Sequence, residues 1–288
     1  MTDTQPVLSS GTFAIGGDLD VRRLGYGAMQ ILGEGRWGEP DDHDGAIAVL
    51  RRAVELGVDF IDTADSYGPF VSENLIREAL HPYGHVRIAT KAGFTRQGPN
   101  VWTMCGQPAY LRQCAEMSLR RLGVETIDLY QLHRIDPDYP LEDQVGLFAD
   151  LVTEGKVRHV GLSEVSVEDL VAAQAVTSIA TVQNLYNVAH RDSEALLDHC
   201  TEHGIGFIPW FPVASGAVAA ADGPLAAITA RTGHTPAQLS LAWLLQRSPV
   251  MLPIPGTKSL AHVEENCASA LVVLDDATVA ELDALAAP

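Results

Sequence analysis

Short runs rich in β-branched and aromatic residues alternate with longer amphipathic stretches along almost the whole 288-residue chain. A regular alternation of strands and helices is typical of a parallel sheet covered by helices. The predicted strands are Arg23–Tyr26, Asp59–Asp62, Arg87–Thr90, Asp128–Leu132, His159–Leu162, Thr181–Asn184, Gly206–Trp210 and Val250–Pro253.

Helical patterns lie between these strands, and several of them stop at a glycine, which commonly caps a helix C-terminus. Thr235 and Gln238 have the spacing of a capping box, and Pro236 between them suits the first helical position. The predicted helices are Gly45–Leu56, Glu73–Leu80, Pro108–Leu122, Leu141–Glu154, Val167–Ala175, Ser193–His203 and Pro236–Gln246.

Eight strand–helix units in about 250 residues favour a closed barrel over two separate domains. We therefore predict the α/β class, with one (β/α)8 TIM-barrel domain over residues 1–288. Phe13–Asp20, with a turn at Gly16-Gly17-Asp18, predicts an N-terminal β-hairpin that closes the bottom of the barrel. Asp275–Leu285 predicts an extra C-terminal helix. An open doubly wound sheet is the competing topology, which the lack of GxGxxG after the first strand disfavours.

The charge of the chain argues against several classes of partner. Asp plus Glu number 37 and Lys plus Arg 19, so the net charge is −18 and the surface repels nucleic acids and anionic membranes. The N-terminus has no signal-peptide pattern, and no uncharged apolar segment reaches the roughly 18 residues of a membrane span. The four cysteines form no CxxC pair, which indicates reduced thiols. We expect a cytoplasmic protein, monomeric by default, that needs no metal.

Three consecutive predicted strands deliver polar side chains to the C-terminal rim, where active sites of such barrels lie. Asp62 ends one strand, Lys91 follows the next and His133 follows the third, with Tyr67 on an intervening loop. A carboxylate keeps a neighbouring ammonium charged, and that charge lowers the pKa of a nearby phenol. A neutral histidine can orient a carbonyl group. The set predicts a site that protonates an oxygen as negative charge develops on it.

Each of these residues also has a structural interpretation when taken alone. Asp62 and Lys91 can form a structural ion pair, His133 can be a hydrogen-bonded core histidine, and Tyr67 can simply pack. A Schiff-base aldolase with Lys91 as nucleophile is a further hypothesis. The aspartate partner argues against it, because it keeps the lysine protonated. The convergence of four such side chains favours proton transfer.

Three segments resemble the signatures of the aldo-keto reductase superfamily. The first is Asp62–Gly68 with Glu73 beyond it, and the second is Ser118–Leu122 leading to Ile127–His133. The third is Ile254–Ser259 followed by Glu264-Glu265-Asn266. The similarity runs in order from about Leu24 to Asn266, and the segments LGYGAMQ and AWLLQRSP resemble bacterial reductases of pyridoxal or general aldehydes.

The resemblance implies NADPH-dependent reduction of aldehydes or ketones, with NADP(H) as cofactor and a small carbonyl compound as substrate. It implies that Tyr67 is the general acid, that Lys91 and Asp62 tune it, and that His133 orients the carbonyl. A cofactor-binding regulatory subunit with slow turnover is the alternative. The residues implied to bind the cofactor are Gly27, Met29, Ser163, Glu164, Gln183, Trp210, Phe211, Pro212, Ser215, Gly216, Lys258, Ser259, His262, Glu265 and Asn266.

Two positions depart from the family pattern. Glu164 replaces the usual asparagine after the strand-five serine, and an ionised carboxylate cannot donate to a carboxamide oxygen. His262 replaces a common arginine, so the hold on the adenosine 2′-phosphate is expected to be weaker or pH-dependent. Lys258 and Ser259 at a helix start suit an anion, although an ordinary N-cap serine beside a solvated lysine fits equally well.

The substrate pocket is expected to be formed by rim loops. These loops carry Trp37 and Trp102, which suggests an aromatic-lined pocket, although single loop aromatics are as often packing residues. Arg96 and Arg134 could meet an acidic or phosphorylated substrate, but solvation at the surface is the simpler expectation for both.

Overall fold

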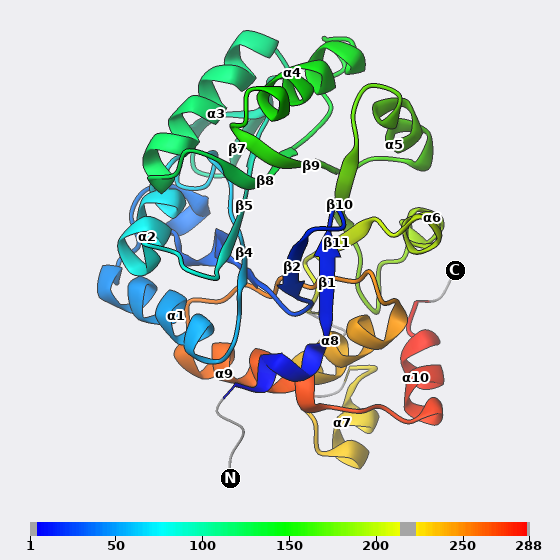
Figure 1. Cartoon of the computed structure of the whole chain (residues 1–288). Coiled ribbons are helices and arrows are strands. Elements are labelled where there is room, and N and C mark those ends of the chain that lie inside the picture. The colour runs from blue at the N-terminus through cyan, green and yellow to red at the C-terminus, as the bar shows by residue number, and fades with distance from the viewer. Residues whose placement is uncertain (1–4, 214–222, 287–288) are drawn as a thin grey trace.

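The computed structural model describes residues 5–213 and 223–286 (Figure 1). Its centre is a seven-stranded parallel sheet in the order β11-β10-β9-β8-β5-β4-β3. The strands are β3 (Tyr26–Gly27), β4 (Phe60–Asp62), β5 (Arg87–Ala92), β8 (Ile127–Leu132), β9 (Val157–Ser163), β10 (Ile179–Leu185) and β11 (Gly206–Trp210).

The segment 250–255 joins the two edges of this sheet and closes the barrel. On one side the Phe207 N–H donates to Val250 O, and the Leu252 N–H donates to Phe207 O. On the other side the Gly25 N–H donates to Pro253 O. The predicted strand Val250–Pro253 thus lies in the eighth position but forms only an isolated bridge. Prolines lack the N–H that a continuous ladder needs. The (β/α)8 barrel is confirmed.

The first strand begins later than predicted. Within the predicted range Arg23–Tyr26, only Tyr26 belongs to β3. The Arg23 N–H instead donates to Gly11 O, and its guanidinium binds the carbonyls of Ser10, Leu245 and Ser248. Arg23 therefore ties the N-terminus to the helix layer rather than extending the sheet.

Helices surround the strands, as Figure 1 shows, and the seven predicted ones occur within two residues of their expected ends. The capping box is also confirmed, because the Thr235 hydroxyl accepts from the Gln238 N–H and the Gln238 side chain accepts from the Thr235 N–H. The helices are α1 (His43–Glu55), α2 (Val71–Leu80), α3 (Pro108–Leu122), α4 (Leu141–Thr153), α5 (Val167–Gln174), α6 (Glu194–His203), α7 (Ala226–Thr232), α8 (Pro236–Arg247), α9 (Leu260–Ala268) and α10 (Asp276–Asp283), with short 3-10 turns η1 (Pro6–Ser10), η2 (Ala28–Ile31), η3 (Glu34–Arg36) and η5 (Ser269–Leu271). The predicted C-terminal helix corresponds to α10.

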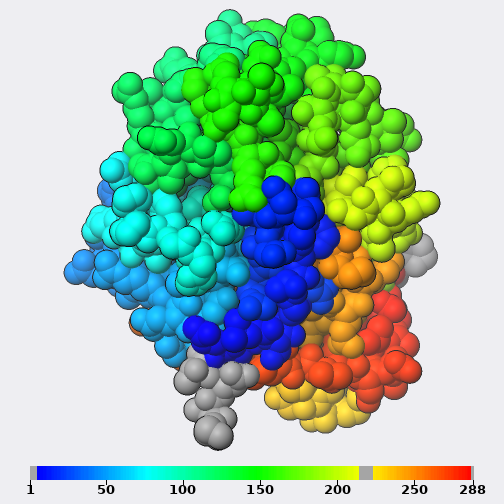
Figure 2. Space-filling model, in the orientation of Figure 1, coloured from blue at the N-terminus to red at the C-terminus, as the bar shows by residue number. Residues whose placement is uncertain are grey.

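The predicted hairpin is present as β1 (Thr12–Ile15) and β2 (Leu19–Arg22), which pair in antiparallel register. Figure 2 shows this N-terminal segment in blue, covering the centre of one face of the molecule. One buried apolar cluster seals the hairpin end of the barrel. It consists of three hairpin side chains and of inward-facing side chains of the strands, some of which lie two residues before the polar strand ends. Its members include Ile15, Leu19, Val21, Phe60, Ala89, Leu129, Ile208 and Leu252.

A second and larger apolar cluster fills the space between the strands and the helices. The thiols of all four cysteines are free. Within residues 5–213 and 223–286, no helix is both long and apolar enough to cross a membrane.

The hairpin turn provides a stability prediction. Gly16 and Gly17 both have positive φ, but a Cβ at Gly16 would lie 2.2 Å from the His159 ring, whereas a Cβ at Gly17 would meet nothing within 4 Å. Gly17→Ala should cost about 1 kcal/mol of unfolding free energy for the left-handed backbone. Gly16→Ala should cost a further ~1–3 kcal/mol, because His159 is held by Asp18 and must move. Urea denaturation of the two variants measures the difference, and equal losses would refute the contact.

Candidate active site

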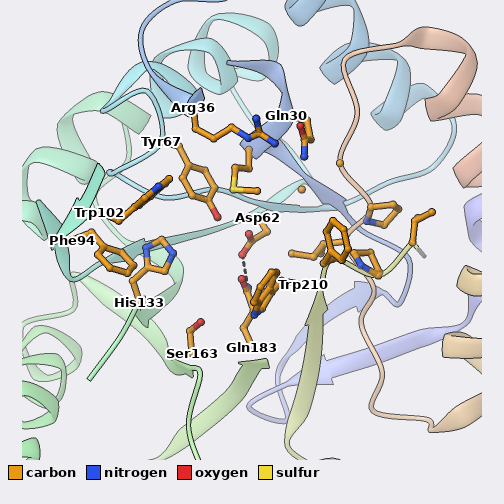
Figure 3. Close-up of a pocket in the computed structure, with 18 of the residues that line it drawn as sticks. Gln30, Arg36, Asp62, Tyr67, Phe94, Trp102, His133, Ser163, Gln183 and Trp210 are labelled. Atoms are coloured by element: carbon orange, nitrogen blue, oxygen red, sulfur yellow. Dashed lines mark hydrogen bonds between the residues drawn. The ribbon is translucent and has the colours of Figure 1, made fainter. Parts of the chain in front are cut away.

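A cavity of about 710 Å³ lies at the C-terminal ends of the strands (Figure 3). This volume falls in the range of roughly 300–1,000 Å³ that is typical of small-molecule sites. Asp62, Ser163, Gln183 and Trp210 reach it from strand ends, and His133 follows β8 directly. The rest of the wall comes mainly from loops and includes Gly27, Met29, Gln30, Arg36, Tyr67, Phe94, Asn100, Trp102, Arg134, Phe211 and Pro212.

A buried ion pair lies beneath the cavity. The Lys91 Nζ is 2.6 Å from Asp62 Oδ2 and 2.7 Å from Thr63 O, and neither charged side chain is more than 2% exposed. Burial by itself lowers the pKa of Lys91, but Asp62 and the Tyr67 hydroxyl raise it above its ordinary value. Lys91 therefore stays an ammonium ion, which argues against the aldolase hypothesis.

Two glutamine amides complete the surroundings of Asp62. The Gln131 and Gln183 amides donate to Asp62 Oδ1 at 3.1 and 2.9 Å. Gln183 was expected at the nicotinamide, and it lines the cavity while also holding the carboxylate. Gln131 was missed, although it lies two residues from Leu129 and His133 on the inward face of a strand.

Tyr67 places its hydroxyl 3.4 Å from Lys91 Nζ, and its side chain is buried against the cavity. Burial raises the pKa of Tyr67 above its ordinary value, and the Lys91 ammonium offsets this only in part. The predicted net lowering of the phenol pKa is therefore wrong, because desolvation outweighs the nearby charge. Tyr67 is protonated at neutral pH, as a proton donor must be.

His133 lies close to Tyr67, with ring centroids 5.9 Å apart. Its Nδ1 is 3.4 Å from the Ser66 hydroxyl. Burial lowers the pKa of His133 well below its ordinary value, and the cations Lys91, Arg134 and Arg96 lower it further. The ring is therefore neutral at pH 7, as predicted for a group that orients a carbonyl.

Part of the wall is a hairpin that the sequence analysis treated as a loop. It consists of β6 (Phe94–Gly98) and β7 (Val101–Met104), and its Phe94 and Trp102 rings pack edge to face at 5.5 Å. Trp102 lines the cavity, as predicted. Trp37 is not among the lining residues. Its ring lies 5.7 Å from the Arg96 guanidinium instead.

Arg96 is not a solvated surface residue. Its guanidinium stacks on Trp102 at 3.5 Å and donates to the carbonyls of Gly35, Arg36, Ser66, Gly98 and Val101. It therefore holds three loops together around the cavity.

The two departures from the family pattern both have partners in the structure. The Glu164 carboxylate accepts from the Trp210 indole N–H and the Leu185 N–H, so it fixes the ring expected to stack on the nicotinamide. His262 lies on α9, and its Nδ1 is 3.5 Å from the hydroxyl of Thr257, which precedes that helix. Ser259 is the N-cap of α9, and Lys258 is exposed beside it.

Arg134 is also more than a surface cation. Its Nη1 donates to the His133 carbonyl and to Ser163 Oγ at 2.6 and 2.9 Å. Arg134 therefore links the residue expected to orient the carbonyl with the serine expected to bind the nicotinamide.

The geometry agrees with comparison to known proteins. The sequence profile of the Aldo/keto reductase family matches residues 23–287. The chain belongs to this family. It is 52% identical over 274 residues to an uncharacterised oxidoreductase of Schizosaccharomyces pombe, covering 95% of this chain and 89% of that protein. It is 40% identical over 285 residues to pyridoxine 4-dehydrogenase of Escherichia coli, covering 96% and 99% respectively.

Solved structures give the same result. An aldo-keto reductase of Klebsiella pneumoniae in complex with NADPH has a TM-score of 0.80 and 29% identity to this chain, with 95% of this chain and 94% of that one covered. The predicted superfamily is confirmed, and this aldo/keto reductase is an oxidoreductase with the barrel fold.

The structure gathers only part of the predicted cofactor set at the cavity. Seven of its members line the wall: Gly27, Met29, Ser163, Gln183, Trp210, Phe211 and Pro212. Lys258, Ser259, His262, Glu265 and Asn266 lie instead on α9 or just before it, following the cavity residue Gly256. Ser215 and Gly216 fall outside the described residues.

Asp65, in the first family signature, is buried but does not reach the cavity. It is 1% exposed, and within the described parts of the chain neither carboxyl oxygen has a hydrogen-bond partner of good geometry. The Cys114 thiol and the Ser66 N–H are close enough to lower its pKa, but they offset burial only in part. Burial raises the pKa of Asp65 to about 7, and the Glu73 carboxylate contributes to this rise. Glu73 itself is held by Arg121 and Thr90. These two acidic motif residues thus belong to the packing behind the site.

Asp65 predicts a pH dependence of stability. The unfolded carboxyl ionises near its ordinary pKa of 3.8, whereas the folded one stays protonated up to about pH 7. The folded state therefore binds more protons between these values, and stability falls as pH rises through this window. In Asp65→Asn the fall between pH 4 and 7 should be smaller by about 3 kcal/mol.

The measurement is the free energy of unfolding by urea at a series of pH values. The exposed Asp41→Asn is the control and should follow the wild type. Parallel curves for Asp65→Asn and the wild type would rule out a protonated Asp65.

Proposed function

We propose that this aldo/keto reductase reduces aldehydes or ketones to alcohols with NADPH. The observation that carries the proposal is the chain of contacts from Asp62 through Lys91 to the Tyr67 hydroxyl at the cavity wall. These contacts provide a phenol, Tyr67, that keeps its proton at neutral pH. They also place it next to an ammonium ion, Lys91, that favours the phenolate once the proton has left.

The residues present fit NADP(H). Ser163 and Gln183 offer polar groups for a carboxamide, and the Trp210 indole, fixed by Glu164, offers a flat face for a ring. Lys258 is exposed at the start of α9, where a helix N-terminus and an ammonium favour a phosphate. The cofactor supplies a hydride to the carbonyl carbon when bound.

The side chains around the carbonyl oxygen orient it and supply its proton. Neutral His133 accepts from the Ser66 hydroxyl at Nδ1 in this proposal, which leaves Nε2–H to donate to the oxygen. Tyr67 then gives its proton to that oxygen as negative charge develops there. Lys91 stabilises the resulting phenolate, and Asp62 keeps Lys91 charged and in place.

Removal of the Tyr67 hydroxyl tests the proton transfer. Tyr67→Phe should lower kcat for aldehyde reduction by about 100-fold or more, because a general acid contributes this much. NADPH affinity, followed by fluorescence titration, should stay within about twofold, since Lys91 and Asp62 remain paired. Tyr139→Phe removes a phenol outside the cavity and is the matched control. Unchanged turnover in Tyr67→Phe would refute the role.

Lys258 tests the phosphate end of the cofactor site. Lys258→Met should weaken NADPH binding by roughly 10- to 100-fold, as expected for the loss of a charge-assisted contact to phosphate. Binding of NADH, which lacks the 2′-phosphate, should not weaken. The two dissociation constants are compared by titration, and an equal loss for both cofactors would contradict a contact between Lys258 and the phosphate.

A further inference from the structure

Arg36 contributes a positive charge to the cavity wall that the sequence analysis did not anticipate. It is half-buried and lines the cavity, and Figure 3 shows its guanidinium extending from the rim beside Gln30, above the Tyr67 ring. Among the described residues, no carboxylate lies within 4 Å of its guanidinium. The chain as a whole has a net charge of −18, so this guanidinium is a local positive charge in an acidic protein.

The other charged groups that line the cavity are held by contacts within the described protein. The Asp62 carboxylate is paired with Lys91. Arg134, like Arg36, has no described carboxylate within 4 Å, but its guanidinium donates to the His133 carbonyl and to Ser163 Oγ. Among the described residues, the Arg36 guanidinium is therefore the cation of this wall that has neither a carboxylate within 4 Å nor a hydrogen bond to the protein.

The backbone holds Arg36 in a conformation that non-glycine residues seldom adopt. Its φ is +57°, in the left-handed region. The Arg36 carbonyl accepts from the Gly68 N–H and from the Arg96 guanidinium at 3.3 and 3.2 Å. Such conformations persist where the surroundings over-determine them, and they concentrate at binding sites. The loop is therefore ordered before any ligand arrives.

Neutral hydrogen-bonding groups share this part of the wall. Gln30 and Asn100 also line the cavity, and the Asn100 N–H donates to Gly35 O, which keeps the two loops together. Each carboxamide carries two N–H donors. A guanidinium with amide donors nearby is suited to a carboxylate or phosphate group.

We propose that the preferred substrates are aldehydes or ketones that carry an anionic group, and that Arg36 binds this group while the carbonyl lies at Tyr67 and His133. The inference rests on the proposed reductase function. It adds the substrate class, and it assigns specificity to a residue outside the proton-transfer set.

The test compares aldehydes of the same shape that differ in charge. With NADPH, kcat/KM for the better of 3- and 4-formylbenzoate should exceed that for the corresponding formylbenzamide by about tenfold or more. Arg36→Gln should bring this ratio to within about twofold of one, mainly through KM, whereas Arg36→Lys should retain part of the preference. 4-Formylphenyl phosphate against the neutral 4-methoxybenzaldehyde gives the corresponding ratio for phosphate, and the larger of the two ratios identifies the preferred anion.

Arg51→Gln is the matched control, because Arg51 is an exposed arginine on α1. It removes the same charge and should leave the ratio unchanged. A wild-type ratio near one, or an unchanged ratio in Arg36→Gln, would overturn the proposal while the reductase function stands.

A binding measurement keeps the proposal testable without turnover. Benzoate and benzamide are unreactive analogues, and quenching of tryptophan fluorescence with NADPH present reports their dissociation constants. Benzoate should bind the wild type more tightly, and Arg36→Gln should abolish the difference. If no aldehyde is reduced but benzoate binding depends on Arg36, the proposed function fails and the anion site remains. Equal binding of the two analogues to the wild type would refute the site.

Discussion

The contact between Asp62 and Lys91 is the interaction on which the site depends. Two opposite charges that are both removed from water are costly unless each is also hydrogen-bonded. Here a backbone carbonyl and the Tyr67 hydroxyl satisfy the ammonium, while amides from β8 and β10 satisfy the carboxylate. The pair therefore requires several strands to stay in register, so the arrangement of the catalytic groups depends on the closure of the barrel.

The inward-facing side chains of the strands are apolar near the hairpin and polar near the cavity. Phe60, Ala89 and Leu129 pack on the hairpin at the sealed end, and two residues further along each strand are Asp62, Lys91 and Gln131. Because side chains on one face of a strand recur every second residue, the apolar plug and the polar network share positions of the same strands. Burial at this boundary keeps Tyr67 protonated and His133 neutral.

Much of this arrangement was predictable from the order of the residues. Period and capping signals located the hairpin, the helices, the three polar side chains at the strand ends and Tyr67 on the loop between two of these strands. Three features were not accessible in this way. The pKa of Tyr67 depends on how much water the fold removes. The eighth strand is weakened by Pro253 and Pro255, which the sequence does display but which an apolar pattern alone does not take into account. The β6–β7 hairpin depends on Arg96, whose partners are backbone carbonyls and leave no trace in a sequence pattern.

The contacts of Arg96 with backbone carbonyls affect which sequence changes the rim loops can tolerate during evolution. Every residue type carries a carbonyl, so the contacts of Arg96 with Arg36, Ser66, Gly98 and Val101 make no direct use of the side chains at those positions. Gly35 is the exception, because its φ is positive and a Cβ there would lie 2.6 Å from Pro99. Neighbouring side chains can be exchanged while the loops keep their path. A rim built in this way lets selection alter what the enzyme recognises without rebuilding the frame that holds it.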